Sequence, residues 1–238
     1  MKIVPLGTEA LLVDFGQTIS PEVNRQAIAL AQRLEESPLP GFLYCAPAYA
    51  SLTVGFDPRR VSFAELCKHL LVLHDDTAKT NTDRDARVFR IPVCYHAAFA
   101  PDLEVVMEHT GLDQEAIIET HCSKIYRVYM LGFLPGFTYL GDVADTLITR
   151  RKARPRTRVP AGSVGLAGRQ TGIYPVDAPG GWQIIGRTPV RTFDPGATPP
   201  FLALPGDQVR FEPVSHNMFT TIEQEVAEGT YQLRQDGA

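Results

Sequence analysis

The sequence carries little of several features that mark particular classes of protein, and each shortage excludes one class. Its 238 residues hold only four cysteines, none in a Cys-x-x-Cys pair, so neither a disulfide framework nor a cysteine zinc site is predicted. The six histidines form no His-Glu-x-x-His motif, and no metal site is predicted from them. We expect reduced, buried thiols at Cys45, Cys67, Cys94 and Cys122.

Excess positive charge is lacking too. A formal net charge of -4 argues against a general nucleic-acid binder, which would carry a strongly basic balance. Two predicted helices, at residues 101–110 and 113–121, superficially resemble a helix-turn-helix, but the second begins Asp113-Gln114-Glu115 and would repel phosphate. The simpler interpretation is a helical hairpin that covers one end of the following sheet.

Long hydrophobic runs and phosphate-binding loops are missing as well. Glu9 and Asp14 interrupt the apolar segment near the N-terminus, and no later run approaches bilayer-spanning length, so a cytoplasmic location is expected. There is no Gly-Lys-Ser/Thr, and the glycines at 162, 165 and 168 have the wrong spacing for a dinucleotide fingerprint. If ATP is used, we expect another chain to hold it.

The first third of the chain has the pattern of a small α+β domain, which we place at residues 1–86. Strands are predicted within 2–15, 42–49 and 51–56, and helices are predicted to begin at Ser20-Pro21 and at Ser62. Ser62 and Glu65 have the spacing of a capping box. This order predicts an antiparallel sheet with two helices on it. The polar stretch 77–87 is predicted to be a linker.

Residues 87–238 are predicted to form a mainly-β barrel, because glycine and proline divide residues 131–195 into short apolar strands. Pro135-Gly136 and Pro179-Gly180 each pair a fixed negative φ with a residue that tolerates positive φ, and both are predicted to be reversing turns. Strands are expected at 163–167, 182–185 and 209–214. The tail after Tyr231 is expected to be frayed.

Polar side chains accompany these glycines and form the candidate site. An amide, a hydroxyl, a phenol and a guanidinium can orient a small substrate that carries a carboxylate and an amide. The alternative is a hydrogen-bonding corner where strands cross, and the sequence alone does not decide between them. The residues are Gln170, Thr171, Tyr174 and Arg187.

Two further patterns have competing interpretations. The basic run 150–158 is either a solvated loop or a place where Arg158 presents its planar fork to a carboxylate or to a partner's acidic surface. The run Ala161-Gly162-Ser163-Val164-Gly165 approximates a nucleophile elbow, with His216 far downstream. Because Gly168, Gly172 and Pro175 forbid the helix that an elbow needs, we favour a serine in a strand or turn.

Four motifs carry a resemblance to a known family. They are Gly-Phe-x-Pro-Gly-Phe-x-Tyr-Leu at 132–140, Val-Pro-Ala-Gly-Ser-Val at 159–164, Gln-Thr-Gly-Ile-Tyr-Pro at 170–175 and Pro-Gly-Gly-Trp-x-x-Ile-Gly-Arg-Thr-Pro at 179–189. The chain resembles the family that includes the B-type subunit of 5-oxoprolinase, the sporulation kinase inhibitor KipI and subunit 1 of allophanate hydrolase. The resemblance covers the whole chain, more weakly before Arg87, and implies a cyclophilin-like barrel after the α+β domain.

The resemblance also implies a function. It implies one subunit of an ATP-dependent 5-oxoprolinase, which cleaves 5-oxo-L-proline to L-glutamate together with A-type and C-type partner chains and is inactive as a single chain. Arg158 or Arg187 would then hold a carboxylate, while Gln170, Thr171 and Tyr174 orient the ring. Two alternatives remain open: a KipI-like inhibitor of a sensor histidine kinase, and a carboxyltransferase half in urea or allophanate metabolism.

Overall fold

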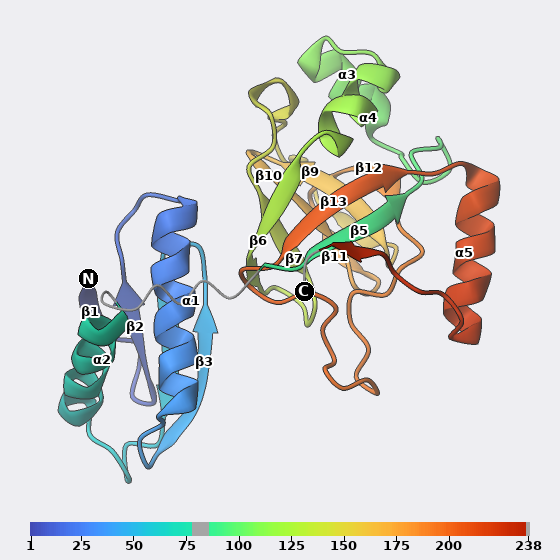
Figure 1. Ribbon diagram of the computed structural model, residues 1–238. Helices are drawn as coiled ribbons and strands as arrows, with labels where there is room; N and C mark the ends of the chain where they lie inside the picture. Colours follow the sequence, from blue (N-terminus) through green and yellow to red (C-terminus); the bar gives the residue numbers. More distant parts are fainter. Residues whose placement is uncertain (78–85, 237–238) are drawn as a thin grey trace. The chain divides into compact units, whose positions relative to one another are not determined.

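A computed structural model describes residues 1–77 and 86–236 of the protein. The chain divides into two compact units, with the boundary between residues 84 and 85 (Figure 1). Most of the predicted linker, residues 78–85, lies outside the described residues. Among the described helices, none is both long enough and apolar enough to cross a bilayer.

The N-terminal unit is an antiparallel four-stranded sheet with two helices, as predicted. The strand order is β1-β2-β4-β3. Buried leucine and valine alternate with less buried residues along β2 (Leu11, Val13) and β4 (Leu52, Val54), so that one face of the sheet packs against both helices. The elements are β1 (Lys2–Pro5), β2 (Ala10–Asp14), α1 (Pro21–Glu36), β3 (Phe42–Pro47), β4 (Ser51–Phe56) and α2 (Phe63–Thr77).

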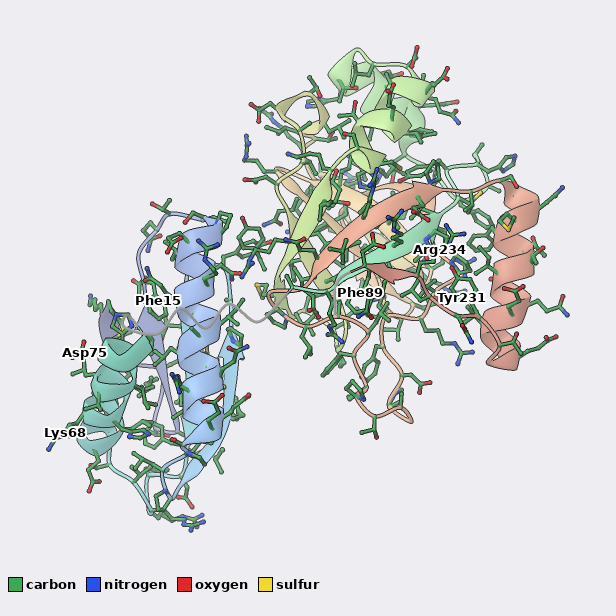
Figure 2. All side chains as sticks on the ribbon, viewed as in Figure 1. Phe15, Lys68, Asp75, Phe89, Tyr231 and Arg234 are labelled. Carbon is green, nitrogen blue, oxygen red and sulfur yellow. The ribbon has the colours of Figure 1, made fainter. Side chains whose placement is uncertain are left out.

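Helix α2 shows the two-sided pattern that its sequence predicts. Leu66 and Leu70 are fully buried in the core shared with the sheet. Lys68 and Asp75 point away from the sheet on the outer side of the helix (Figure 2). The apolar positions therefore recur at helical spacing on one face, which is why this segment folds as a helix rather than as a strand.

The start of α2 is fixed by the predicted capping box. The Ser62 hydroxyl oxygen accepts a hydrogen bond from the Glu65 amide at 3.2 Å, and the Glu65 carboxylate accepts one from the Ser62 amide at 2.9 Å. We expect Ser62→Ala to destabilise the first turn by about 1 kcal/mol. Hydrogen exchange of the α2 amides should then be about fivefold faster. Ser62→Thr keeps the hydroxyl and is the control; equal acceleration in both variants would contradict this role.

The C-terminal unit is built on an eight-stranded mixed sheet of order β12-β9-β10-β7-β6-β13-β5-β14, in which only the β13–β5 pair is parallel. A two-stranded sheet of β8 and β11 accompanies it. The strands are β5 (Val88–Val93), β6 (Ile125–Leu131), β7 (Thr138–Gly141), β8 (Arg156–Val159), β9 (Ser163–Ala167), β10 (Gln170–Ile173), β11 (Ala178–Gly180), β12 (Gln183–Arg187), β13 (Gln208–Pro213) and β14 (Gln235–Asp236).

Strand β12, at one end of the order, meets the end of β5, which lies next to the other end. Cys94, directly after β5, and Arg187, the last residue of β12, exchange two backbone hydrogen bonds of 2.8 and 3.0 Å. The strand series that runs from β5 through β13, β6, β7, β10 and β9 to β12 therefore returns to its beginning. Closure of a sheet removes exposed edges. That the closed arrangement is of the cyclophilin-like type stays a prediction.

Two hydrophobic clusters lie on opposite sides of the β9–β10 region. The interior cluster holds side chains such as Leu140, Val164 and Ile173, together with α3 and α4 residues. An outer cluster of Phe137, Tyr174, Trp182 and their neighbours lies on the other face. The helices of this unit are α3 (Leu103–Thr110), α4 (Gln114–Cys122), the short 3₁₀ helix η1 (Asp145–Leu147) and α5 (His216–Glu228).

The two Pro-Gly pairs have different structures. Gly136 has φ of +80°, as a turn requires, and follows the predicted pattern. The prediction of a turn at Pro179-Gly180 is wrong, because both residues lie in β11. Glycine is needed at 180 for another reason: a Cβ there would lie 2.2 Å from the Tyr174 hydroxyl.

The chain end also differs from the prediction. The segment after Tyr231 is not frayed through residue 236, since β14 pairs with β5 and Asp236 forms an ion pair with Arg90. Figure 2 labels Phe89, Tyr231 and Arg234 along this part of the C-terminal unit. Helix α5, which follows β13 (Figure 1), was not predicted, although Ser215 caps its start and Gly229 ends it in the left-handed conformation.

The thiols differ in part from the prediction. All four are free, as expected, but only Cys94 is fully buried. Cys45, Cys67 and Cys122 are half-buried.

Candidate functional site

Three of the sequence motifs meet at the loop between β8 and β9. The Gly162 amide donates to the Tyr174 carbonyl at 2.8 Å, and the Tyr174 amide donates to the Ser163 carbonyl at 2.9 Å. The Thr188 amide donates to the Gly162 carbonyl at 2.9 Å. Backbone hydrogen bonds to the residues that follow β10 and β12 therefore fix the position of the loop of residues 160–162.

Charged side chains surround this loop. One Asp177 carboxylate oxygen accepts from the Ala161 amide and the other from Arg158 Nε, both at 2.8 Å. These hydrogen bonds, from the amide first and Arg158 second, lower the pKa of Asp177 below its usual value. On the other side, Arg187 Nε donates to the Ala161 carbonyl at 2.8 Å. Arg158 therefore already has a carboxylate partner, and Arg187 has a carbonyl.

Arg187 lies beside aromatic side chains that no local sequence pattern places there. Its guanidinium carbon is 5.7 Å from the centre of the Phe99 ring and 5.8 Å from that of Phe219. The ring of His216 is 5.3 Å from Phe99 and 5.1 Å from the nearly parallel ring of His96. These residues come from the end of β5 and the start of α5, segments more than 100 residues apart in sequence.

Strand β10 separates the candidates that lie close together in sequence. Thr171 and Ile173 face the interior, where Thr171 is fully buried. Tyr174 is 1% exposed and packs in the outer cluster, with its ring edge-on to Phe137. Gln170, half-buried, is one residue before Thr171 and so faces the opposite side from it.

The structure thus brings together Arg158 and Arg187, around Ala161 and Asp177, and does not bring all five candidates to one cavity. Thr171 and Tyr174 are buried on opposite faces of the sheet and have structural partners. For these two side chains the geometry favours the hydrogen-bonding corner that the sequence left open. Catalytic roles for the five residues stay predictions.

Thr171 belongs to a buried polar chain that sequence reasoning missed. His121 Nε2 lies 2.9 Å from the Thr171 hydroxyl, and His121 Nδ1 lies 2.7 Å from the Tyr95 hydroxyl. The imidazole stacks on Phe211 with ring centres 4.5 Å apart. Complete burial lowers the pKa of His121 to about 3, because a charged imidazole would lose its hydration.

This buried imidazole predicts a pH dependence of stability. An unfolded histidine takes up a proton near pH 6.5, whereas folded His121 resists protonation until about pH 3, so protons favour the unfolded chain and stability falls as pH falls through that window. In His121→Gln the slope of unfolding free energy between pH 6 and 4 should decrease by up to about 1.4 kcal/mol per pH unit. Urea unfolding at several pH values measures it.

The neighbouring Cys122→Ser variant provides the control. It leaves His121 unchanged. The Cys122 thiol, which lies 3.4 Å from the Tyr95 oxygen, is replaced by a hydroxyl. Its slope should match that of the unaltered chain. An unchanged slope in His121→Gln would show that this histidine takes no part in acid destabilisation.

The basic run is not simply a solvated loop. Asp102, whose side chain is 1% exposed, accepts two hydrogen bonds from Arg156 at 2.6 and 2.7 Å and one from Lys152 at 2.8 Å. The Ile184 amide donates a fourth at 2.7 Å. Arg158, by contrast, is exposed and pairs with Asp177, so part of the run is structural and part lies on the surface.

Three glycines of the central stretch lie close to other parts of the protein. A Cβ at Gly162 would lie 2.2 Å from the Thr188 carbonyl oxygen, and one at Gly172 would lie 2.6 Å from that of Thr138. A Cβ at Gly165 would lie 3.1 Å from Trp182. These three positions therefore serve close packing, and the place where ATP binds stays a prediction.

Ser163 does not form a nucleophile elbow. It begins β9 and is 2% exposed. The strand placement follows the interpretation that the glycines and Pro175 favoured.

Comparison with known proteins identifies the family to which this chain is similar. The family model described as carboxyltransferase domain, subdomain C and D, matches residues 1–203. The B-type 5-oxoprolinase subunit of Bacillus subtilis (strain 168) is 40% identical and covers 94% of this chain, which spans 97% of that protein. The protein of the same name from Escherichia coli O157:H7 is 38% identical over 87% of this chain and 94% of its own.

Longer proteins also contain a similar segment. A urea amidolyase from Lachancea kluyveri is 32% identical over 96% of this chain, which spans 14% of that protein. The protein in the crystal structure of TTHA0988 is 42% identical in sequence to this chain, with a TM-score of 0.77. The match covers 87% of this chain and 40% of that one. The Kluyveromyces lactis urea amidolyase shares the fold, with a TM-score of 0.83 at 19% identity, over 99% of this chain and 16% of its own.

Proposed function

The chain belongs to the family of the carboxyltransferase domain, subdomains C and D, and from that premise we propose that it is the B-type subunit of a 5-oxoprolinase. One observation carries this proposal. Identity of 40% extends over almost the full length of both this chain and the B-type 5-oxoprolinase subunit of Bacillus subtilis. A match of this extent favours the same role over a shared domain in a different enzyme.

The proposed reaction is the ATP-dependent opening of 5-oxo-L-proline to L-glutamate. Water adds across the lactam C–N bond, while ATP is hydrolysed to ADP and phosphate. Because the sequence has no Gly-Lys-Ser/Thr loop and Gly162, Gly165 and Gly172 are closely packed by the protein itself, we assign ATP binding to a partner chain. The contribution of this chain is positioning and anion stabilisation by its arginines beside the 160–162 loop.

The test is co-expression with A-type and C-type chains, followed by an assay of glutamate release from 5-oxoproline. Glutamate should appear only with all three chains and with ATP. Reactions that lack one chain or ATP are the controls. Full activity from this chain alone, or none from the complete set, would contradict the proposal.

Urea metabolism is the second candidate. It has the support of the 32% identity to the L. kluyveri urea amidolyase over 96% of this chain. Under this alternative, the partners would include a biotin carboxylase, and the complete set would consume ATP with urea and not with 5-oxoproline. This chain can be combined with each set of partners in turn and assayed with both substrates. A role as a histidine-kinase inhibitor stays a prediction.

A further inference from the structure

Arg187 has two terminal nitrogens that no described protein group uses. The one side-chain hydrogen bond that Arg187 makes to the described residues runs from Nε to the Ala161 carbonyl. The Asp177 carboxylate on the same loop is already held by Arg158 and the Ala161 amide. The side chain is half-buried. Its terminal nitrogens are therefore only partly accessible to water, and they have no partner among the described residues.

The guanidinium is also held in place. The Nε hydrogen bond fixes its plane relative to the 160–162 loop, and the rings of Phe99 and Phe219 contact it at 5.7 and 5.8 Å. Phe99 and Phe219 in turn pack 4.4 Å apart. An arginine fixed in this way loses little side-chain entropy when it binds a ligand, which is a property of preformed binding sites.

Two exposed histidines continue this cluster. His96 and His216 stack with ring centres 5.1 Å apart, and His216 packs against the same Phe99 that contacts Arg187. His216 is the first residue of α5, whose first turn contains no acidic residue. Imidazole N–H groups and a guanidinium fork are donors suited to an anion, and no carboxylate on α5's first turn competes for them.

We propose that Arg187, with His96 and His216 beside it, forms a subsite for the carboxylate of a small ligand. Under the proposed function, on which the ligand's identity rests, that carboxylate is the one carried by 5-oxoproline. The planar fork matches the two oxygens of a carboxylate. Of the two arginines that the sequence analysis considered, the geometry favours Arg187, because Arg158 is exposed and paired with Asp177.

The experiment measures binding to the full chain by following the histidine imidazole signals in NMR titrations. The ligands are 5-oxoproline, acetate, inorganic phosphate and 2-pyrrolidinone, which is the same lactam without a carboxylate. We expect saturable shifts of the His96 and His216 signals with 5-oxoproline and acetate, and none with 2-pyrrolidinone. Arg187→Gln should weaken 5-oxoproline binding at least about tenfold.

Two variants make the result specific. Arg187→Lys keeps the charge and removes the planar fork, so it should not restore the affinity. Arg191→Gln removes an exposed arginine four residues further along and should bind as the unaltered chain does. Arg187→Gln keeps the backbone hydrogen bonds that close the sheet but removes the Nε hydrogen bond to the Ala161 carbonyl, so its thermal midpoint is measured too, and its affinity is determined well below that midpoint.

Each contrary result is distinct. Equal shifts with 2-pyrrolidinone, phosphate binding without carboxylate binding, no saturable shift with either carboxylate, or unaltered affinity in Arg187→Gln would overturn the subsite. Acetate binding that depends on Arg187 would support it even if the three-chain assay yields no glutamate, so the subsite and the proposed function can fail separately.

Discussion

Replacing Asp102 with asparagine is expected to lower the unfolding free energy of the C-terminal unit by about 2–4 kcal/mol, because it leaves two cations without their counter-charge. Removing one partner of a fully buried ion pair costs about 3–5 kcal/mol. Lys152 and Arg156 are 25% and 28% exposed and can reach some water, which reduces the expected loss. Asparagine has nearly the same shape, so the loss does not come from a cavity.

The position of Asp102 explains why so much depends on it. Its carboxylate joins the beginning of α3 to β8 through Arg156 and to β12 through the Ile184 amide. Burial alone would raise the pKa of Asp102, but the hydrogen bonds from Arg156, Lys152 and Ile184 outweigh it and lower the pKa. Its stabilisation is therefore present above pH 4 or so and is lost as pH falls through the lowered pKa.

Urea unfolding followed by Trp182 fluorescence measures the effect within the C-terminal unit, since Trp182 is the single tryptophan and is buried there. Asp177→Asn is the matched control. It removes a carboxylate that also pairs with an arginine of the basic run, but at the surface, where such pairs contribute little. Similar losses in the two variants would show that burial of Asp102 does not set its contribution.

Gly162→Ala is expected to cost about 2–5 kcal/mol, from two additive causes. Gly162 has φ of +78°, which costs an alanine about 1–2 kcal/mol. A Cβ would also lie 2.2 Å from the Thr188 carbonyl oxygen, and such overpacking costs about 1–3 kcal/mol. Because the contact is with backbone, the loop must move away from β12.

Gly168→Ala separates these two causes. Gly168 has φ of +59°, but nothing lies within 4 Å of a Cβ built there, so only the conformational cost of about 1–2 kcal/mol applies. Thermal or urea unfolding of both variants gives the difference directly. A Gly162→Ala loss no larger than that of Gly168→Ala would mean that the Thr188 contact relaxes without cost.

Local signals in the sequence predicted most of the individual elements. Ser20 and Ser62 start helices, Gly111 ends one, and Gly136 forms a turn, because each effect depends on a residue and its immediate neighbours. The signals for α5 were also present in Ser215 and Gly229 and were overlooked.

The site was harder to predict, for two reasons. The first is a signal that the sequence contains: Thr171 lies in a strand and Tyr174 just after it, three residues further on. Such an odd spacing puts the two side chains on opposite faces. The second is information that no local pattern in the sequence contains. The pairs Asp102–Arg156 and His121–Thr171 join residues 54 and 50 positions apart, and such contacts depend on strand pairing that periodicity does not specify.

The junction of Cys94 with Arg187 has a consequence for motion. Two backbone hydrogen bonds connect the end of β12 to the residue after β5 there, whereas the ladders of β5 with β13 and of β9 with β10 are longer. Brief local opening should occur at this seam before the rest of the sheet separates. Since Arg187 is one of the two seam residues, an anion bound to its guanidinium would slow deuterium uptake at the Cys94 and Arg187 amides.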